Sequence, residues 1–133
     1  MTTLSRRQAR RQALVLLYQW DLGGGNAELG AQYAGEIDPW ARALAEEAAA
    51  QSSGLDERIT RAADGWTAGR LGTVERSALR VAIHELDRAE VPPEVVIDEA
   101  VAFAKRYASE DAARLVNGIL GRIQREEAHE HIG

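Results

Sequence analysis

Apolar residues recur at three- and four-residue spacing along most of the chain, as they do on one face of an α-helix. The clearest run begins at Thr73, in TVERSALRVAIHELDRAE, where the apolar face is formed by Val74, Ala78, Leu79, Val81, Ala82, Ile83 and Leu86. The alternation of apolar and polar residues that is typical of strands is nearly absent. The pattern therefore predicts an all-α fold.

Start and stop signals divide the chain into six or seven helices. The first runs from about Arg6 to Leu22, with Thr3 or Ser5 as its cap and three glycines after it. Asp38 followed by Pro39 starts a helix that reaches about residue 51. Further helices are expected at residues 55–64, 73–90, 94–107 and 110–127, the last capped by Ser109. A short helix at 27–34 is the seventh, weakened by Gly30 and Gly35.

Short connections between these helices are typical of an antiparallel assembly of two packed helical bundles in a single domain. We expect this all-helical domain to span residues 1–128 and the polar tail, residues 129–133, to fray. Trp66 lies in a glycine-containing connection, where it is either a turn residue or a plug of the core.

Composition removes several classes of function. The chain has no cysteine, which excludes disulfides and thiolate zinc sites and favours a reducing cytoplasm. Arginines followed by a short apolar run open the chain, as in a secretory signal, but Gln12, Gln19 and Asp21 interrupt that run. No stretch approaches the length of a membrane span.

Residues suited to catalysis or metal binding are not grouped in a useful way. The acidic residues at 46–47, 98–99, 110–111 and 126–127 are adjacent, so the members of each pair point to different helix faces. His129 and His131 lie in the tail without a third ligand nearby, and His84 sits beside apolar positions as a structural or interface histidine. We expect no catalytic residue, no metal and no cofactor.

Four arginines near the start form a local positive site on a chain whose formal net charge is -5. They are Arg6, Arg7, Arg10 and Arg11, and no acidic residue precedes Asp21. On a helix Arg6 lies above Arg10 and Arg7 above Arg11, with Tyr18 continuing the second row. Guanidinium groups match phosphate oxygens and a tyrosine ring stacks on bases, so the pattern favours single-stranded RNA. The alternative is an ordinary solvated helix face.

Asn117 and Gly118 lie in the middle of the last predicted helix, although both residue types cost helix propensity. One interpretation is that Asn117 ties down a neighbouring helix end and Gly118 permits close helix packing. The other is that RNA meets the helix at Asn117.

Three segments, in order, resemble the NusB family of transcription antitermination proteins. They are SRRQARRQALVLLYQWDL at the start, VERSALRVAIHEL in the middle and VPPEVVIDEAVAFAKRYASEDAARLVNGIL near the end. The resemblance implies a non-enzymatic protein that binds the boxA element of nascent RNA. It also implies a partner, ribosomal protein S10 (NusE), within an antitermination complex on RNA polymerase that supports ribosomal RNA transcription.

The same resemblance assigns residues. Arg6, Arg7, Arg10 and Arg11 are expected to contact phosphates, with Tyr18 as a stacking partner. Lys105, Arg106 and Tyr107 are expected to extend the RNA track, and Asn117 is a candidate RNA contact on the second interpretation given above. For the S10-like partner we expect the surface of the helix that carries Glu75, Arg76, His84 and Glu85, since acidic positions suit a basic ribosomal protein.

Two alternatives come from other classes of protein. The first is an interaction adaptor, or a homodimer that buries Arg10, Arg11 and Leu14 against its twin and so masks the arginine face. The second is a DNA-binding helix-turn-helix protein, which is weaker because no helix precedes the arginines to brace them in a groove.

Overall fold

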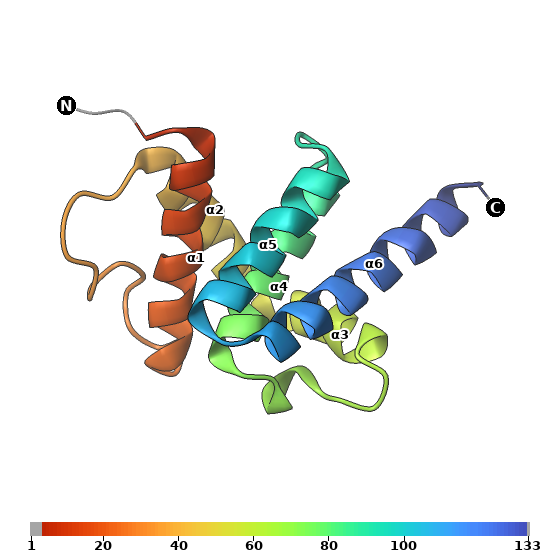
Figure 1. Ribbon diagram of the computed structural model, residues 1–133. Coiled ribbons are helices and arrows are strands. Elements are labelled where there is room, and N and C mark those ends of the chain that lie inside the picture. Colours follow the sequence, from red (N-terminus) through yellow and green to blue (C-terminus); the bar gives the residue numbers. More distant parts are fainter. Residues whose placement is uncertain (1–3, 133) are drawn as a thin grey trace.

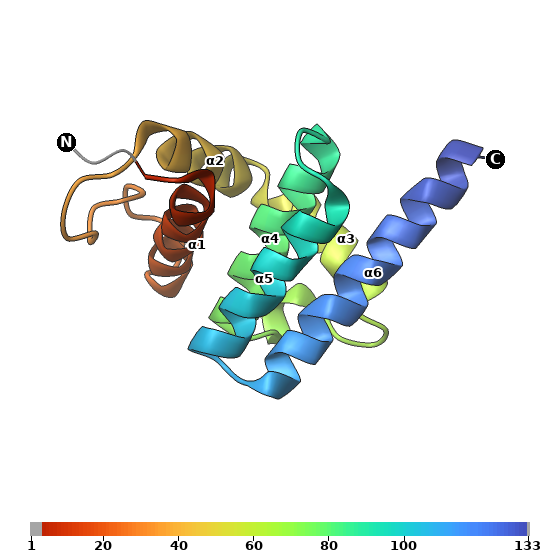
Figure 2. The same ribbon diagram turned by 45° about the horizontal axis from the view of Figure 1, so that its top comes forward.

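The computed structural model describes the backbone of residues 4–132 and the side chains of residues 4–127. The helices are α1 (Arg6–Leu22), α2 (Pro39–Ala50), α3 (Ser52–Ala62), α4 (Thr73–Arg88), α5 (Pro93–Tyr107) and α6 (Glu110–Ile132), with a 3-10 turn, η1 (Ala68–Arg70). The described residues contain no strand, so the all-α prediction is confirmed. α1 and α2 form one group, and α5 lies between α1 and α6 (Figures 1 and 2).

Most helix ends lie where the capping residues predict them. The Ser5 hydroxyl accepts a hydrogen bond from the Gln8 amide, and the Gln8 side chain accepts one from the Ser5 amide, which closes the start of α1. Asp38 caps α2 in the same way through the amide of Ala41. The other predicted cap of α1, Thr3, lies outside the described residues.

Three local predictions differ from the structure. The segment 27–34 forms turns and no helix, because Gly30 adopts a φ of 89°, which a right-handed helix does not allow. α3 begins at Ser52, so only Gln51 separates it from α2, and the backbone of α6 continues to Ile132, past the expected end at about Glu127. Trp66, for which the sequence left two interpretations, is 53% exposed and is therefore a turn residue, not a plug of the core.

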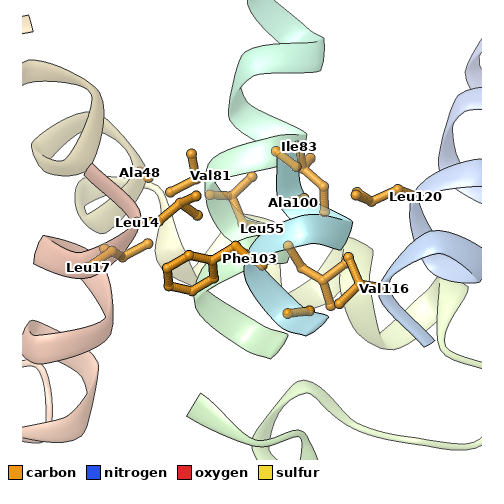
Figure 3. Packing of buried hydrophobic residues seen from close by; sticks show 14 of the residues in the cluster. Leu14, Leu17, Ala48, Leu55, Val81, Ile83, Ala100, Phe103, Val116 and Leu120 are labelled. Atoms are coloured by element: carbon orange, nitrogen blue, oxygen red, sulfur yellow. The ribbon is translucent and has the colours of Figure 1, made fainter. Parts of the chain in front are cut away.

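The core is built around α4, in which every residue from Ser77 to Glu85 is buried. Figure 3 shows Phe103 of α5 on the side of α1, near Leu14 and Leu17, while Val116 and Leu120 of α6 lie on the opposite side. Burying such side chains stabilises the fold by about 1.5–3 kcal/mol each relative to leaving them exposed. α4 and α5 are therefore held between α1 on one side and α6 on the other.

Partly buried ion pairs join α1 and α3 to α4. Asp21, near the end of α1, pairs with Arg76 at 2.6 Å and with Arg80 at 3.3 Å, and Arg80 also pairs with Asp56 of α3 at 2.7 Å. Such pairs fix the relative positions of the helices because breaking one leaves an uncompensated buried charge. In the part of the chain that is described, no helix is both long and apolar enough to span a bilayer.

Candidate nucleic-acid interface

The two arginine rows of α1 meet different neighbours. Arg10 is only 4% exposed, and its guanidinium donates to both carboxylate oxygens of Glu85, at 2.5 and 3.0 Å. Arg6 is exposed, with its guanidinium carbon 4.3 Å from the ring centre of Trp40, and that of Arg10 lies 5.6 Å from the same ring. The prediction that Arg10 contacts phosphate is therefore wrong, because its charge is buried in a bidentate pair within the chain.

Arg7 and Arg11 lie on the other row and remain exposed. They border a hollow of about 470 Å³ between α1 and the last two turns of α5, which we call the α1–α5 groove. Its lining consists of Arg7, Arg11, Leu14, Glu99, Ala102, Phe103, Lys105, Arg106 and Tyr107. Sequence reasoning placed Arg7 and Arg11 in one segment and residues 105–107 in another, and the structure brings the two segments together.

The end of α5 presents its basic and aromatic residues for local reasons. Lys105 and Arg106 occupy the last turn, where cations favourably meet the negative end of the helix dipole. The Tyr107 ring packs against Phe103 with 4.8 Å between ring centres, and the Arg106 guanidinium lies 5.6 Å from the Tyr107 ring centre. Tyr107 nevertheless stays 48% exposed, so its ring is accessible for stacking.

The groove carries four basic residues and one acidic residue, Glu99. Arg7 lies 3.2 Å from Glu99, but its side chain is 69% exposed, so this pair restrains the guanidinium only weakly. The Glu99 side chain is only 16% exposed. The surface of the groove therefore carries an excess of positive charge from its four basic side chains. An anion with repeated charges fits this arrangement better than a neutral ligand does.

Asn117 lies beyond Lys105, in a second hollow of about 280 Å³ that Lys105 and Arg114 also line. Asn117 is exposed, and a Cβ at Gly118 would have no neighbour within 4 Å. The expected close helix packing at Gly118 is therefore wrong, and Arg114, which the sequence did not single out, extends the basic track. Tyr18 is half-buried and lines neither of these hollows.

A family model described as "NusB family" matches residues 7–125 of this chain. The chain belongs to the NusB family. The transcription antitermination protein NusB of Heliobacterium modesticaldum is 41% identical over 131 residues, a match that covers 92% of this chain. The chain spans 64% of the length of that relative.

Solved structures give the same assignment. NusB of T. maritima superposes with a TM-score of 0.79 at 33% identity, over 94% of both chains. A crystal structure of the antitermination factors NusB and NusE in complex with double-stranded RNA superposes with a TM-score of 0.77 at 31% identity, over 91% of this chain and 96% of that one. The NusB-like all-α fold predicted from sequence is therefore confirmed.

In this NusB family member, two of the four residues expected to bind a protein partner, His84 and Glu85, are buried, and Glu75 and Arg76 are half-buried. His84 and Glu85 are each 4% exposed, with His84 Nε2 2.7 Å from Glu47 and Glu85 paired with Arg10. Arg76 donates to Asp21 and to the carbonyls of Ala68 and Leu71. Glu75 accepts a hydrogen bond from the Gly72 amide and so closes the start of α4. The prediction is wrong for Arg76, His84 and Glu85, because these side chains hold the helices together.

Glu47 of α2 is half-exposed and joins this network at its outer edge. The hydrogen bond with His84 lowers the pKa of Glu47 below its ordinary value, against the opposing effect of burial, and Arg88 lowers it further by a hydrogen bond and by its charge. Glu47 is 2.6 Å from Arg88. The ionised carboxylate therefore links α2 to the last two turns of α4.

The burial of Arg10 also bears on the alternative of a homodimer that masks the arginine face. Of the three residues that a twin was expected to cover, Arg10 and Leu14 are already buried within the chain, at 4% and 2% exposure. Arg11 is exposed and lines the α1–α5 groove. A dimer that masks RNA binding would have to cover Arg7 and Arg11 instead.

Proposed function

We propose that this NusB family member is a transcription antitermination factor that holds single-stranded, boxA-like RNA in the α1–α5 groove. The observation that carries the proposal is the convergence of Arg7 and Arg11 from α1 with Lys105, Arg106 and Tyr107 from α5 around one hollow. The antitermination role is supported by the relative in Heliobacterium modesticaldum. Binding of RNA is supported by the similar structure that contains NusB, NusE and double-stranded RNA.

The charges of the chain favour this groove over other surfaces for RNA. Four basic side chains line it, while the whole chain has a formal net charge of -5, so the remainder repels a polyanion and restricts it to the groove. Arginine and lysine supply phosphate contacts, and Tyr107 supplies an exposed ring for a base. Four phosphate contacts with a single strand give a log–log salt slope of about -2.8.

The proposal includes a protein partner similar to ribosomal protein S10, or NusE, and action within an antitermination complex on RNA polymerase in ribosomal RNA transcription. Its support is the similar structure in which NusB and NusE occur together. Because Arg76, His84 and Glu85 are engaged within the chain, the partner has to bind elsewhere, with partly exposed Glu75 as the remaining residue of the expected surface.

Fluorescence anisotropy with a short boxA-like oligonucleotide and a scrambled control tests this function. Each RNA is titrated with and without S10 at several salt concentrations. We expect preferential binding of the boxA-like RNA, a slope near -2.8 and tighter binding in the presence of S10. A salt-sensitive preference that S10 strengthens supports the proposal.

Equal or absent binding of both RNAs, even with S10, contradicts it and favours the adaptor or the dimer. Sedimentation over a range of protein concentrations then separates these two. A chain that stays monomeric at high concentration excludes the masked dimer.

A further inference from the structure

A third hollow, distinct from the one at Asn117, adjoins the α1–α5 groove and differs from it in charge. It has a volume of about 740 Å³ and lies between the first half of α1 and the segment 33–39. Arg11 and Tyr107 line both hollows, so the two are neighbours that share these side chains. Among the described residues that line the larger one, Arg11 is the single basic residue, against Glu36 and Asp38. We call it the tyrosine hollow, after Tyr33 and Tyr107.

The outer wall of the tyrosine hollow is held in place before any ligand binds. Gln12 is 8% exposed, and its amide Nε2 donates to the Tyr33 hydroxyl and to the Glu36 carbonyl, each at 3.0 Å. Gln12 Oε1 accepts a hydrogen bond from the Asp38 amide at 2.8 Å, while the Asp38 carboxylate caps α2. A wall fixed in this way loses little conformational entropy on binding.

The lining suits a flat, uncharged ligand with polar edges. Tyr33 and Tyr107 contribute rings, and Leu4, Val15 and Ile37 contribute apolar surface. The Tyr33 hydroxyl accepts from Gln12, which leaves its proton free to be donated to a ligand. The carboxylates of Glu36 and Asp38 disfavour a phosphate group here, in contrast to the groove next to it.

We propose that the tyrosine hollow takes one unpaired base of the RNA strand whose phosphates lie in the α1–α5 groove. This inference rests on the proposed function. A nucleobase is planar, uncharged and rich in hydrogen-bond acceptors, and every base has a face that stacks on a tyrosine ring. Because Arg11 lines both hollows, a strand that contacts Arg11 through phosphate passes the mouth of the tyrosine hollow. A base within a duplex is unavailable, so the hollow selects single strands.

A scan of abasic RNAs tests the inference. Each nucleotide of a bound single strand is replaced in turn by an abasic one, and affinity is measured for the unmodified protein, for Ala34→Trp and for Gln32→Trp. Ala34 lines the hollow and is exposed, so tryptophan there adds a bulky side chain to its wall, whereas Gln32 is an exposed neighbour outside the lining. Thermal melting checks that each variant is folded, and Tyr33→Leu, which removes the ring and the hydroxyl, serves as a second variant.

We expect one position at which loss of the base weakens binding to the unmodified protein by about fivefold or more. In Ala34→Trp and in Tyr33→Leu the intact RNA binds more weakly by a similar factor, and the abasic change at that position has no further effect. Gln32→Trp behaves as the unmodified protein. Arg7→Ala with Arg11→Ala weakens binding of every RNA in the scan by the same factor.

Two results overturn the inference in different ways. If RNA binds with the expected salt dependence but no abasic position is coupled to Ala34 or Tyr33, the hollow holds no base while the proposed function stands. A protein segment is then the alternative occupant. If no RNA binds at all, the proposed function and the base site both fail.

Discussion

Arg10 and Arg11 are neighbours in sequence and belong to opposite parts of the molecule. Arg10 is 4% exposed and paired with Glu85, which lies 75 residues away in the chain, whereas Arg11 is exposed and lines the α1–α5 groove. One helical step of about 100° separates the two side chains. The Arg6 and Arg10 row therefore serves the structure of the domain, and the Arg7 and Arg11 row is available to a ligand.

This difference shows that four equal charges in a short segment do not form one binding surface. The row of Arg6 and Arg10 faces Trp40 and Glu85 and contributes to the stability of the fold. Salt screens the buried pair of Arg10 and Glu85 only weakly. The row that faces α5 is exposed, so a phosphate strand bound there would displace counterions and its binding would depend strongly on salt. Four experiments break or sharpen the distinction.

The largest effect is expected for Arg10→Ala. It leaves the Glu85 carboxylate buried without its partner, and breaking such a pair costs about 3–5 kcal/mol of the free energy of unfolding. Arg11→Ala is the matched control, because it removes the same side chain at an exposed position and is expected to cost less than about 0.5 kcal/mol. Urea unfolding measures both values. Equal stabilities for the two variants would remove the distinction between the rows.

A second effect is expected for Arg7→Ala combined with Arg11→Ala. Loss of two phosphate contacts reduces the log–log salt slope from about -2.8 to about -1.4 and weakens RNA binding roughly 25-fold at 0.1 M salt. Anisotropy measures the affinity, and circular dichroism is expected to show unchanged helix content. Arg61→Ala with Arg70→Ala is the control, since both arginines are exposed outside the groove and the change in net charge is the same. Similar losses in the two double variants would mean that net charge alone attracts RNA.

A smaller effect is expected for Glu47→Gln, which tests the pH dependence of the internal network. The folded protein holds the pKa of Glu47 below its ordinary value, so this carboxylate contributes stability at neutral pH that is lost as pH falls below about 4. Because the side chain is 39% exposed, the contribution is at most about 1 kcal/mol. In urea unfolding from pH 7 to pH 3, the free energy of unfolding of the unmodified protein is expected to approach that of Glu47→Gln as the pH falls. A constant difference across that range contradicts the assignment.

The smallest effect is expected for Arg6→Ala. Its cation–π contact with Trp40 is exposed and contributes about 0.5–1 kcal/mol to folding. If Arg6 belongs with Arg10, the salt slope of RNA binding stays unchanged. A decrease of about 0.7 in the magnitude of the slope would show that Arg6 contacts a phosphate and would place it with Arg7 and Arg11.

The sequence was sufficient for the helices and for the family, because capping residues and helical spacing are local signals. Ser5 and Asp38 cap helices as predicted, and the resemblance in three separate segments agrees with the family assignment. The segment 27–34 was not predictable in the same way, since the backbone at Gly30 depends on how the connection packs against residues further along the chain.

The division of the arginines needed tertiary information, although part of the signal is present in the sequence. Arg10 lies three, four and seven residues before Ala13, Leu14 and Leu17, which places it on the buried face of α1. Nothing local identifies Glu85 as its partner, because that contact depends on how α1 packs against α4. His84 and Glu85 were mistaken for a docking surface for the same reason: their helix is surrounded by other elements, and polar residues within it need partners inside the chain.

The central position of α4 has a consequence for how this protein can change over evolutionary time. Substitutions between Ser77 and Glu85 meet packed neighbours on every side, so nearly all of them are expected to lower the yield of folded protein. The end of α5 is exposed and is followed by a new helix start at Ser109, so replacement of Lys105, Arg106 or Tyr107 is expected to cost the fold less. If these residues contact RNA as proposed, a lineage can alter which RNA it prefers at a few surface positions while the scaffold that presents them stays unchanged.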